Sequence, residues 1–133
     1  MNNSNFSAEK IAYLNMIEST ISRMADNAFK IKGWVISINV ALATLFFSQR
    51  NSGFKIAIAI IGFASVIIFF MYDNKFLSLE KYYRNLYDTV RLLKDGNINF
   101  DLTPKKVDHL TNRENLVLYI SMLFLWFIGV VIL

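Results

Sequence analysis

Residues 56–72, IAIAIIGFASVIIFFMY, form an apolar stretch that contains no charged side chain. Two further uncharged stretches, residues 33–49 and 116–133, lie before and after it in the sequence. A bilayer core about 30 Å thick is crossed by a helix of roughly 20 apolar residues, so each stretch is long enough to span a membrane once. The sequence therefore predicts an all-α membrane protein with three long transmembrane helices, over about residues 33–49, 55–72 and 115–133.

The composition agrees with this class of protein. The chain has 133 residues, of which 55% are hydrophobic and 18% are charged. This much apolar surface needs lipid or partner chains to cover it. The length predicts a single domain over residues 1–133.

The sequence offers little for catalysis. It has one histidine, no cysteine, no glycine-rich phosphate loop and no pair of acidic residues inside an apolar stretch. Nucleophilic, metal-assisted and acid–base sites need such residues in combination. We therefore expect a protein that is not an enzyme and that binds neither a metal nor a cofactor.

The distribution of Lys and Arg predicts an orientation. Only Arg50 and Lys55 lie between the first two apolar stretches, whereas most other basic residues precede the first or lie between the second and third. Loops rich in Lys and Arg stay in the cytoplasm. We expect a multi-pass protein of the plasma membrane with a cytoplasmic N-terminus, a C-terminus outside, and cytoplasmic helical regions at residues 7–32 and 73–114.

The first two apolar stretches continue into amphipathic helices. Apolar residues recur every three or four positions on one face of each helix, which are Leu14, Ile17, Ile21, Met24, Ala28, Ile31 and Val35, and then Phe69, Tyr72, Phe76, Leu79, Tyr83, Leu86, Val90 and Leu93. Ser7 is a predicted helix start, Gly96 a predicted helix end, and Thr103 with Pro104 a predicted restart. These patterns predict a cytoplasmic helical bundle that continues the membrane-spanning helices.

Small and hydroxylated residues follow one face of the first apolar stretch, and Asn39 lies roughly opposite them. The face consists of Gly33, Ser37, Ala41, Thr44 and Ser48, at helical spacing. Such a face either packs closely against another helix or lines a water-filled path, because polar groups in hydrocarbon need partners. The Asn39 amide has the same two interpretations. These six residues are the candidate pore-lining or helix-packing set.

A basic and aromatic segment follows the second apolar stretch. Its candidate ligand-binding residues are Lys81, Arg84, Tyr87, Arg91 and Lys94, together with Lys105 and Lys106 across the loop. In a symmetric oligomer they would form a ring able to hold phosphates, with tyrosine rings for base stacking. The acidic residues among them favour the alternative that they only neutralise one another, and contact with lipid headgroups explains the basic residues nearest the membrane equally well.

Residues 13–34, YLNMIESTISRMADNAFKIKGW, carry a resemblance to a known family. The segment resembles small membrane effectors of bacterial anti-phage defence, in particular the Hailong-type ion channel subunit, through the pair Arg23 and Met24, Asn27, and Lys32-Gly33-Trp34. The resemblance implies a bacterial inner-membrane channel that is a tetramer, held shut at its cytoplasmic helices by a nucleic-acid ligand from a partner nucleotidyltransferase. Opening would depolarise the cell.

The sequence leaves three functions open. The first is a pore or ion channel gated through its cytoplasmic helices by an anionic nucleotide or oligonucleotide. It would be a homo-oligomer, because the three spans of one chain enclose too little space for a conduit. The second is a non-conducting membrane anchor that presents its cytoplasmic helices to a partner. The third is a holin-like lesion former without a ligand. No Asp, Glu, Lys or Arg lies inside a span, which disfavours a proton relay or a voltage sensor.

Overall fold

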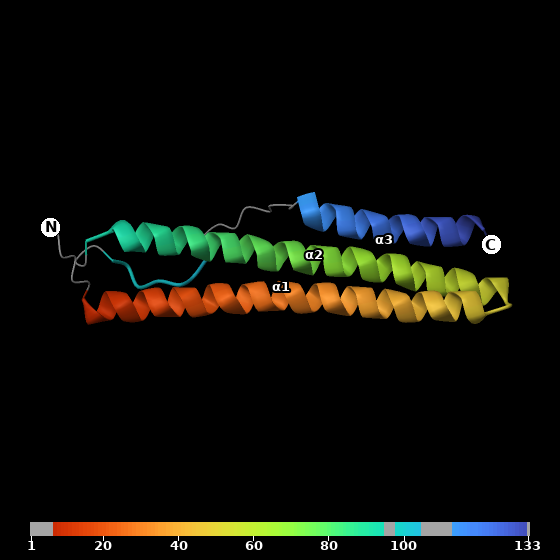
Figure 1. Ribbon diagram of the computed structural model, residues 1–133, viewed down its shortest axis with the longest axis horizontal. Helices are drawn as coiled ribbons and strands as arrows, with labels where there is room; N and C mark the ends of the chain where they lie inside the picture. The colour runs from red at the N-terminus through yellow and green to blue at the C-terminus, as the bar shows by residue number, and fades with distance from the viewer. Residues whose placement is uncertain (1–6, 95–97, 105–112, 133) are drawn as a thin grey trace.

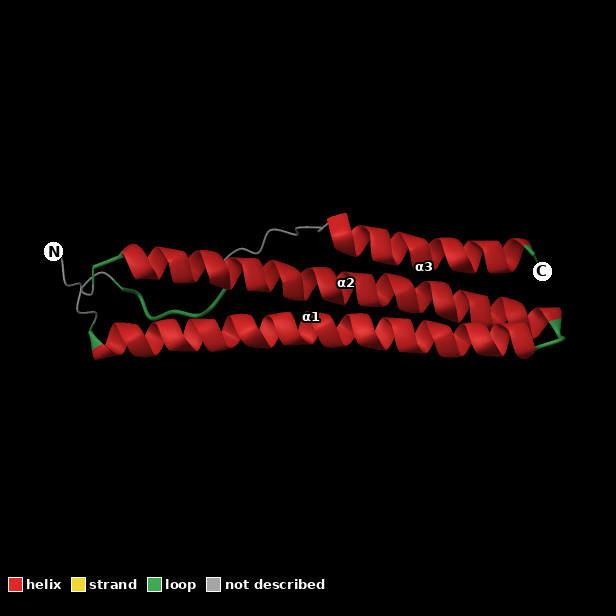
Figure 2. Cartoon of the chain, viewed as in Figure 1, coloured by secondary structure: helices red, strands yellow, loops and turns green. Residues whose placement is uncertain are grey.

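The computed structural model describes residues 7–94, 98–104 and 113–132. These residues form three helices and no strand, namely α1 (Ala8–Ser48), α2 (Ser52–Leu92) and α3 (Arg113–Val131). Figure 2 shows helices along almost the whole described chain. The prediction of an all-α chain is therefore confirmed for these residues.

Helices α1 and α2 form a long antiparallel hairpin, as Figure 1 shows. Each has 41 residues, which at 1.5 Å per residue gives about 60 Å. The Ser7 side chain accepts a hydrogen bond from the backbone N–H of Lys10, and the Asn51 side chain accepts from Gly53 and Phe54. These caps satisfy backbone donors that a helix start leaves without partners. The predicted helix start at Ser7 is confirmed.

The hairpin has an apolar half, near the turn at residues 49–51, and a polar half, near the N-terminus. Helix α3 lies beside α2 along the apolar half only (Figure 1). In the polar half the non-helical segment 98–104 lies along the hairpin instead, and its Ile98 and Leu102 pack on the core between α1 and α2. Each half therefore has its own hydrophobic core, one around Val66 and Trp126 and one around Ile17 and Tyr83.

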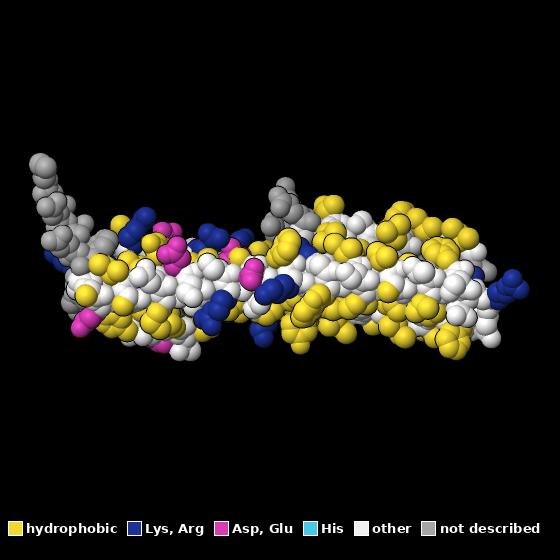
Figure 3. Space-filling model, turned by 60° about the horizontal axis from the view of Figure 1, so that its bottom comes forward, with side chains coloured by type: hydrophobic (Ala, Val, Ile, Leu, Met, Phe, Trp, Pro, Cys, Tyr) yellow, Lys and Arg dark blue, Asp and Glu magenta, His cyan; other side chains and the backbone are white. Residues whose placement is uncertain are grey.

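The apolar half exposes large hydrophobic side chains over the face that Figure 3 shows. Helices α1 and α2 are each long and apolar enough to cross a membrane, yet only 22% of the most apolar window of each is buried. Helix α3 adds a shorter apolar stretch, Asn115–Val131. A helix in the core of a soluble protein would be mostly buried, whereas most residues in the windows of α1 and α2 are not buried.

The predicted apolar stripes are largely correct. In α1 the stripe from Leu14 to Val35 faces α2 and is buried or half-buried throughout. In the second stripe two members are wrong, because Leu93 lies past the end of α2 and is 37% exposed, and Tyr72 is 53% exposed. The residue after Tyr72, Asp73, is fully buried in its place. The register therefore brings a carboxylate into the helix interface where the pattern predicted an aromatic ring.

The predicted helix ends in the polar half were less accurate. Helix α2 ends at Leu92, and Leu93 caps it in an extended conformation. The predicted end at Gly96 was too late, and Gly96 itself lies outside the described residues. Thr103 and Pro104 are not helical, and the stretch that they were expected to begin, residues 105–112, also lies outside the described residues.

Candidate functional site

Asn39 holds the three helices together in the middle of the apolar half. Its side-chain oxygen accepts a 2.7 Å hydrogen bond from the Trp126 indole N–H of α3, and its amide donates to the Ser65 hydroxyl of α2 at 3.2 Å and to its own Val35 carbonyl at 2.8 Å. The Ser65 hydroxyl donates in turn to the Gly62 carbonyl. We call Asn39, Ser65 and Trp126 the polar bridge. It places the amide against other helices of the same chain.

The polar bridge depends on a glycine. Gly62 lies against the Trp126 ring so closely that an added Cβ would be 2.3 Å from two of its carbon atoms. Real Cβ atoms do not approach carbon atoms so closely, so a side chain here would push α3 away from α2. The Trp126 ring also packs edge-on against Phe46 of α1, with centroids 5.9 Å apart. The indole therefore fills the space that a lumen within one chain would need.

The small face of α1 points away from this core. All five of its residues, Gly33, Ser37, Ala41, Thr44 and Ser48, are exposed. The hydroxyls of Ser37, Thr44 and Ser48 donate to backbone carbonyls of their own helix at 2.9 Å. A hydroxyl bonded in this way tolerates lipid, yet its oxygen can still accept from water or from a neighbouring chain. Within the described chain no other helix covers this face.

A buried ion pair lies where the apolar half meets the polar half. The Lys32 ammonium on α1 donates to the Asp73 carboxylate on α2 at 2.8 Å. The Asp73 side chain is fully buried, whereas the Lys32 side chain is 28% exposed. The Tyr119 hydroxyl of α3 lies next to the same carboxylate. We call Lys32 and Asp73 the junction pair, because it ties α1 to α2 where both helices pass from one half to the other.

Tyrosine hydroxyls fasten the segment 98–104 to the polar half. Tyr13 donates to the Asp101 carbonyl at 2.9 Å, and Tyr83 donates to the Leu102 carbonyl at 3.0 Å. The Tyr13 ring also packs edge-on against Phe100. Burial raises the pKa of the Tyr13 phenol, and the nearby Asp101 carboxylate raises it further. The sequence pattern did not predict these contacts, because their acceptors are backbone carbonyls.

Four of the candidate ligand-binding residues, Lys81, Arg84, Tyr87 and Arg91, lie on α2, and two of them are paired with acidic residues. Arg84 donates to Glu80 through two nitrogens, at 2.7 and 2.9 Å, and Arg91 lies 3.7 Å from Asp88. Tyr87 lines a shallow groove of about 440 Å³ with Arg84, Asp88 and Glu18. Lys81 and Lys94 are exposed, and Lys105 and Lys106 lie outside the described residues. An anionic ligand at Arg84 would have to compete with Glu80.

Comparisons with known proteins add no identification. No protein family model matches this chain, and neither a characterised protein nor a solved structure does. The resemblance of residues 13–34 to defence channel subunits therefore stays a prediction.

Proposed function

We propose that the apolar half of this protein crosses the bacterial inner membrane, with the polar half in the cytoplasm and the turn at residues 49–51 outside. The exposed apolar side chains of the apolar half support insertion, since water would not tolerate so many of them together. The aromatic side chains Trp34 and Tyr72 are 61% and 53% exposed near the boundary between the halves. Amphipathic rings favour that depth at the inner membrane interface.

Within this membrane we propose that several copies form a pore. The core of one chain is filled by Trp126 and Phe46, so a conduit has to lie between copies. The small face of α1 is the surface best suited to it, since it is exposed, small and hydroxylated along the whole apolar half. Ser37 and Thr44 can offer their hydroxyl oxygens to ions or water there. A tetramer is the assembly that the resemblance implies.

The cytoplasmic helices supply the gate in this proposal. Because α1 and α2 are unbroken for 41 residues each, a movement in the polar half is transmitted to the apolar half without a hinge. The ligand is an anionic nucleotide or oligonucleotide at the Arg84 and Arg91 face, made by a partner nucleotidyltransferase, and the open pore depolarises the cell in antiviral defence. Such a ligand must displace Glu80 from Arg84 and Asp88 from Arg91.

The test of the pore is ion flux from liposomes that contain the purified protein. Ser37→Leu and Thr44→Leu should each lower the flux roughly tenfold or more, because leucine narrows and dries the path. Ile60→Leu, on the exposed side of α2, is the matched control and should keep the flux. Unchanged flux in both small-face variants would show that the ion path lies on another face. No flux from the unaltered protein would reject the pore.

One observation favours the second candidate, a membrane anchor that presents its cytoplasmic helices to another protein. In the polar half, α1 exposes Ile11, Met16 and Phe29, which are 47%, 55% and 76% exposed. Exposed apolar side chains on a cytoplasmic helix are available to a helix of another protein. Ile11 and Phe29 lie on one side of α1, and Met16 lies about 140° around the helix from them at 3.6 residues per turn. An anchor would bind its partner through these side chains and show no flux, whereas in a pore they would join the copies.

A further inference from the structure

An apolar groove runs between α1 and α3 on the side of the bundle away from α2. It has a volume of about 420 Å³. Val40, Ala43 and Phe47 line it from α1, Leu125 and Trp126 line it from α3, and Ile132 lines it just after α3. The groove exists because α3 packs on α2 and meets α1 mainly through Trp126, at the polar bridge and at Phe46. Its Asn39 oxygen is already occupied by the indole, so the groove offers a hydrocarbon surface.

The length of the groove matches one acyl chain. Its lining extends over residues 36–47 of α1 and residues 122–132 in and just after α3, which at 1.5 Å per residue is about 15 Å. The acyl chains of one leaflet fill half of a hydrocarbon core about 30 Å thick. The lining occupies most of the apolar half of α1, and its Phe46 end lies nearest the turn at residues 49–51.

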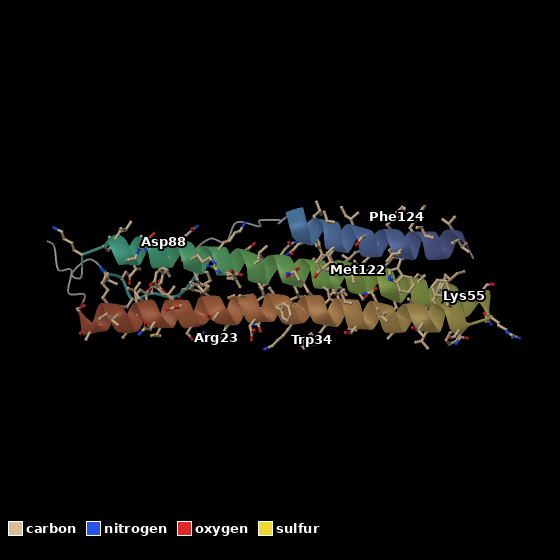
Figure 4. The ribbon with its side chains drawn as sticks, viewed as in Figure 1. Arg23, Trp34, Lys55, Asp88, Met122 and Phe124 are labelled. Atoms are coloured by element: carbon tan, nitrogen blue, oxygen red, sulfur yellow. The ribbon has the colours of Figure 1, made fainter. Side chains whose placement is uncertain are left out.

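A cation lies at the end of the groove near the turn. The Lys55 ammonium is 5.5 Å from the centroid of the Phe46 ring, which lines the groove. The Lys55 label in Figure 4 lies near the turn end of the hairpin. A lysine at the edge of an apolar site is placed to meet the phosphate of a lipid whose chain lies inside.

We propose that this groove is a lipid site, which holds one acyl chain of a phospholipid whose phosphate contacts Lys55. The proposal rests on membrane insertion and not on the pore. The observations that carry it are the apolar lining, the length, which matches one acyl chain, and the cation at the end near the turn. A second copy of the chain would fill the groove with side chains instead, and the test below distinguishes the two occupants.

The experiment uses the two tryptophans as separate reporters in vesicles of phosphatidylglycerol brominated on its acyl chains. Trp34→Phe leaves Trp126 in the groove, and Trp126→Phe leaves Trp34 at the edge of the apolar half. Bromine quenches tryptophan at contact distance, so quenching of Trp34 reports insertion and quenching of Trp126 reports a chain in the groove. We expect both tryptophans to be quenched.

Two matched variants identify the site. Ala43 lines the groove, whereas Ala41 is exposed on α1 and does not line it. In the Trp34→Phe protein, Ala43→Phe should reduce the quenching of Trp126 at least twofold and Ala41→Phe should leave it unchanged. Lys55→Gln should weaken the preference for phosphatidylglycerol over a neutral glycolipid by a few fold. Both results would support the proposal.

Three outcomes would overturn it. Equal quenching of Trp126 in the Ala43→Phe and Ala41→Phe proteins would show that bulk lipid, not a groove lipid, reaches the indole. Quenching of Trp34 without quenching of Trp126, together with a disulfide between copies that carry Val40→Cys, would assign the groove to a second copy. If neither tryptophan were quenched, membrane insertion and the lipid site would both be rejected.

Discussion

In the apolar and polar halves of the hairpin, a different third element packs against the two long helices. In the apolar half α3 covers α2, and one asparagine joins all three helices. In the polar half the non-helical segment 98–104 lies on both helices, held by tyrosine hydroxyls that donate to its backbone carbonyls. A helix satisfies its own backbone and so can face lipid, whereas a non-helical segment needs water or donors beside it. The difference agrees with the proposal that the apolar half crosses the membrane.

A buried ion pair joins α1 to α2 at the boundary between the two halves. Asp73 is fully buried at the boundary and is paired with Lys32. An ion pair of this kind contributes little net stability, yet losing one partner leaves an uncompensated charge. The junction pair thus fixes the register of α1 against α2, while the two halves pack different third elements.

The largest predicted effect comes from breaking the junction pair. Lys32→Met should lower the free energy of unfolding by about 3–5 kcal/mol, because Asp73 then stays buried without its cation. The double variant Lys32→Met with Asp73→Leu should recover most of this loss. Thermal unfolding in detergent, followed by circular dichroism, measures both. A double variant as unstable as the single one would show that the pair does more than cancel charge.

The apolar half can be broken separately at Gly62. Gly62→Val should separate α3 from α2 and cost about 1–3 kcal/mol through overpacking, since a Cβ there meets the Trp126 ring at 2.3 Å. Gly33→Val is the control, because a Cβ at Gly33 has no atom within 4 Å. Protease cleavage next to α3 and the emission of Trp126 report the separation. Equal behaviour of the two variants would contradict the close contact.

The sequence predicted the helices of the hairpin and most of the stripe by which they pack, because both follow from local spacing. It did not predict the junction pair, since a stripe of apolar residues has no place for Asp73. The short turn at residues 49–51 could have predicted which residues of α1 and α2 lie opposite each other. In an antiparallel hairpin with such a turn, residues at comparable distances before and after it lie opposite each other, and this register brings Lys32 to Asp73 and Asn39 to Ser65.

The polar bridge offers a smaller effect within the apolar half. Asn39→Leu removes the acceptor of the Trp126 indole and the donor to Ser65. Side-chain hydrogen bonds between membrane helices are worth about 0.6 kcal/mol on average and at most about 1.7 kcal/mol, so the loss should stay below that of Lys32→Met. Unfolding in mixed detergent micelles measures it. A loss of several kcal/mol would mean that the bridge also fixes the helix register.

The smallest effect sharpens the comparison from the polar side, and it depends on pH. Tyr13→Phe removes the hydrogen bond to the Asp101 carbonyl, which should cost about 1 kcal/mol and speed protease cleavage within segment 98–104. Because the pKa of Tyr13 is raised above 10.0 in the folded state, the fold keeps this phenol protonated while the unfolded chain ionises. The stability from Tyr13 is therefore complete below about pH 10 and is lost as the pH rises further.

Cleavage measured between pH 8 and about 11 should accelerate less in Tyr13→Phe than in the unaltered protein, whereas α3, which this segment does not touch, should be cleaved at the same rate in both. Equal acceleration in both proteins would show that Tyr13 does not hold the segment in place.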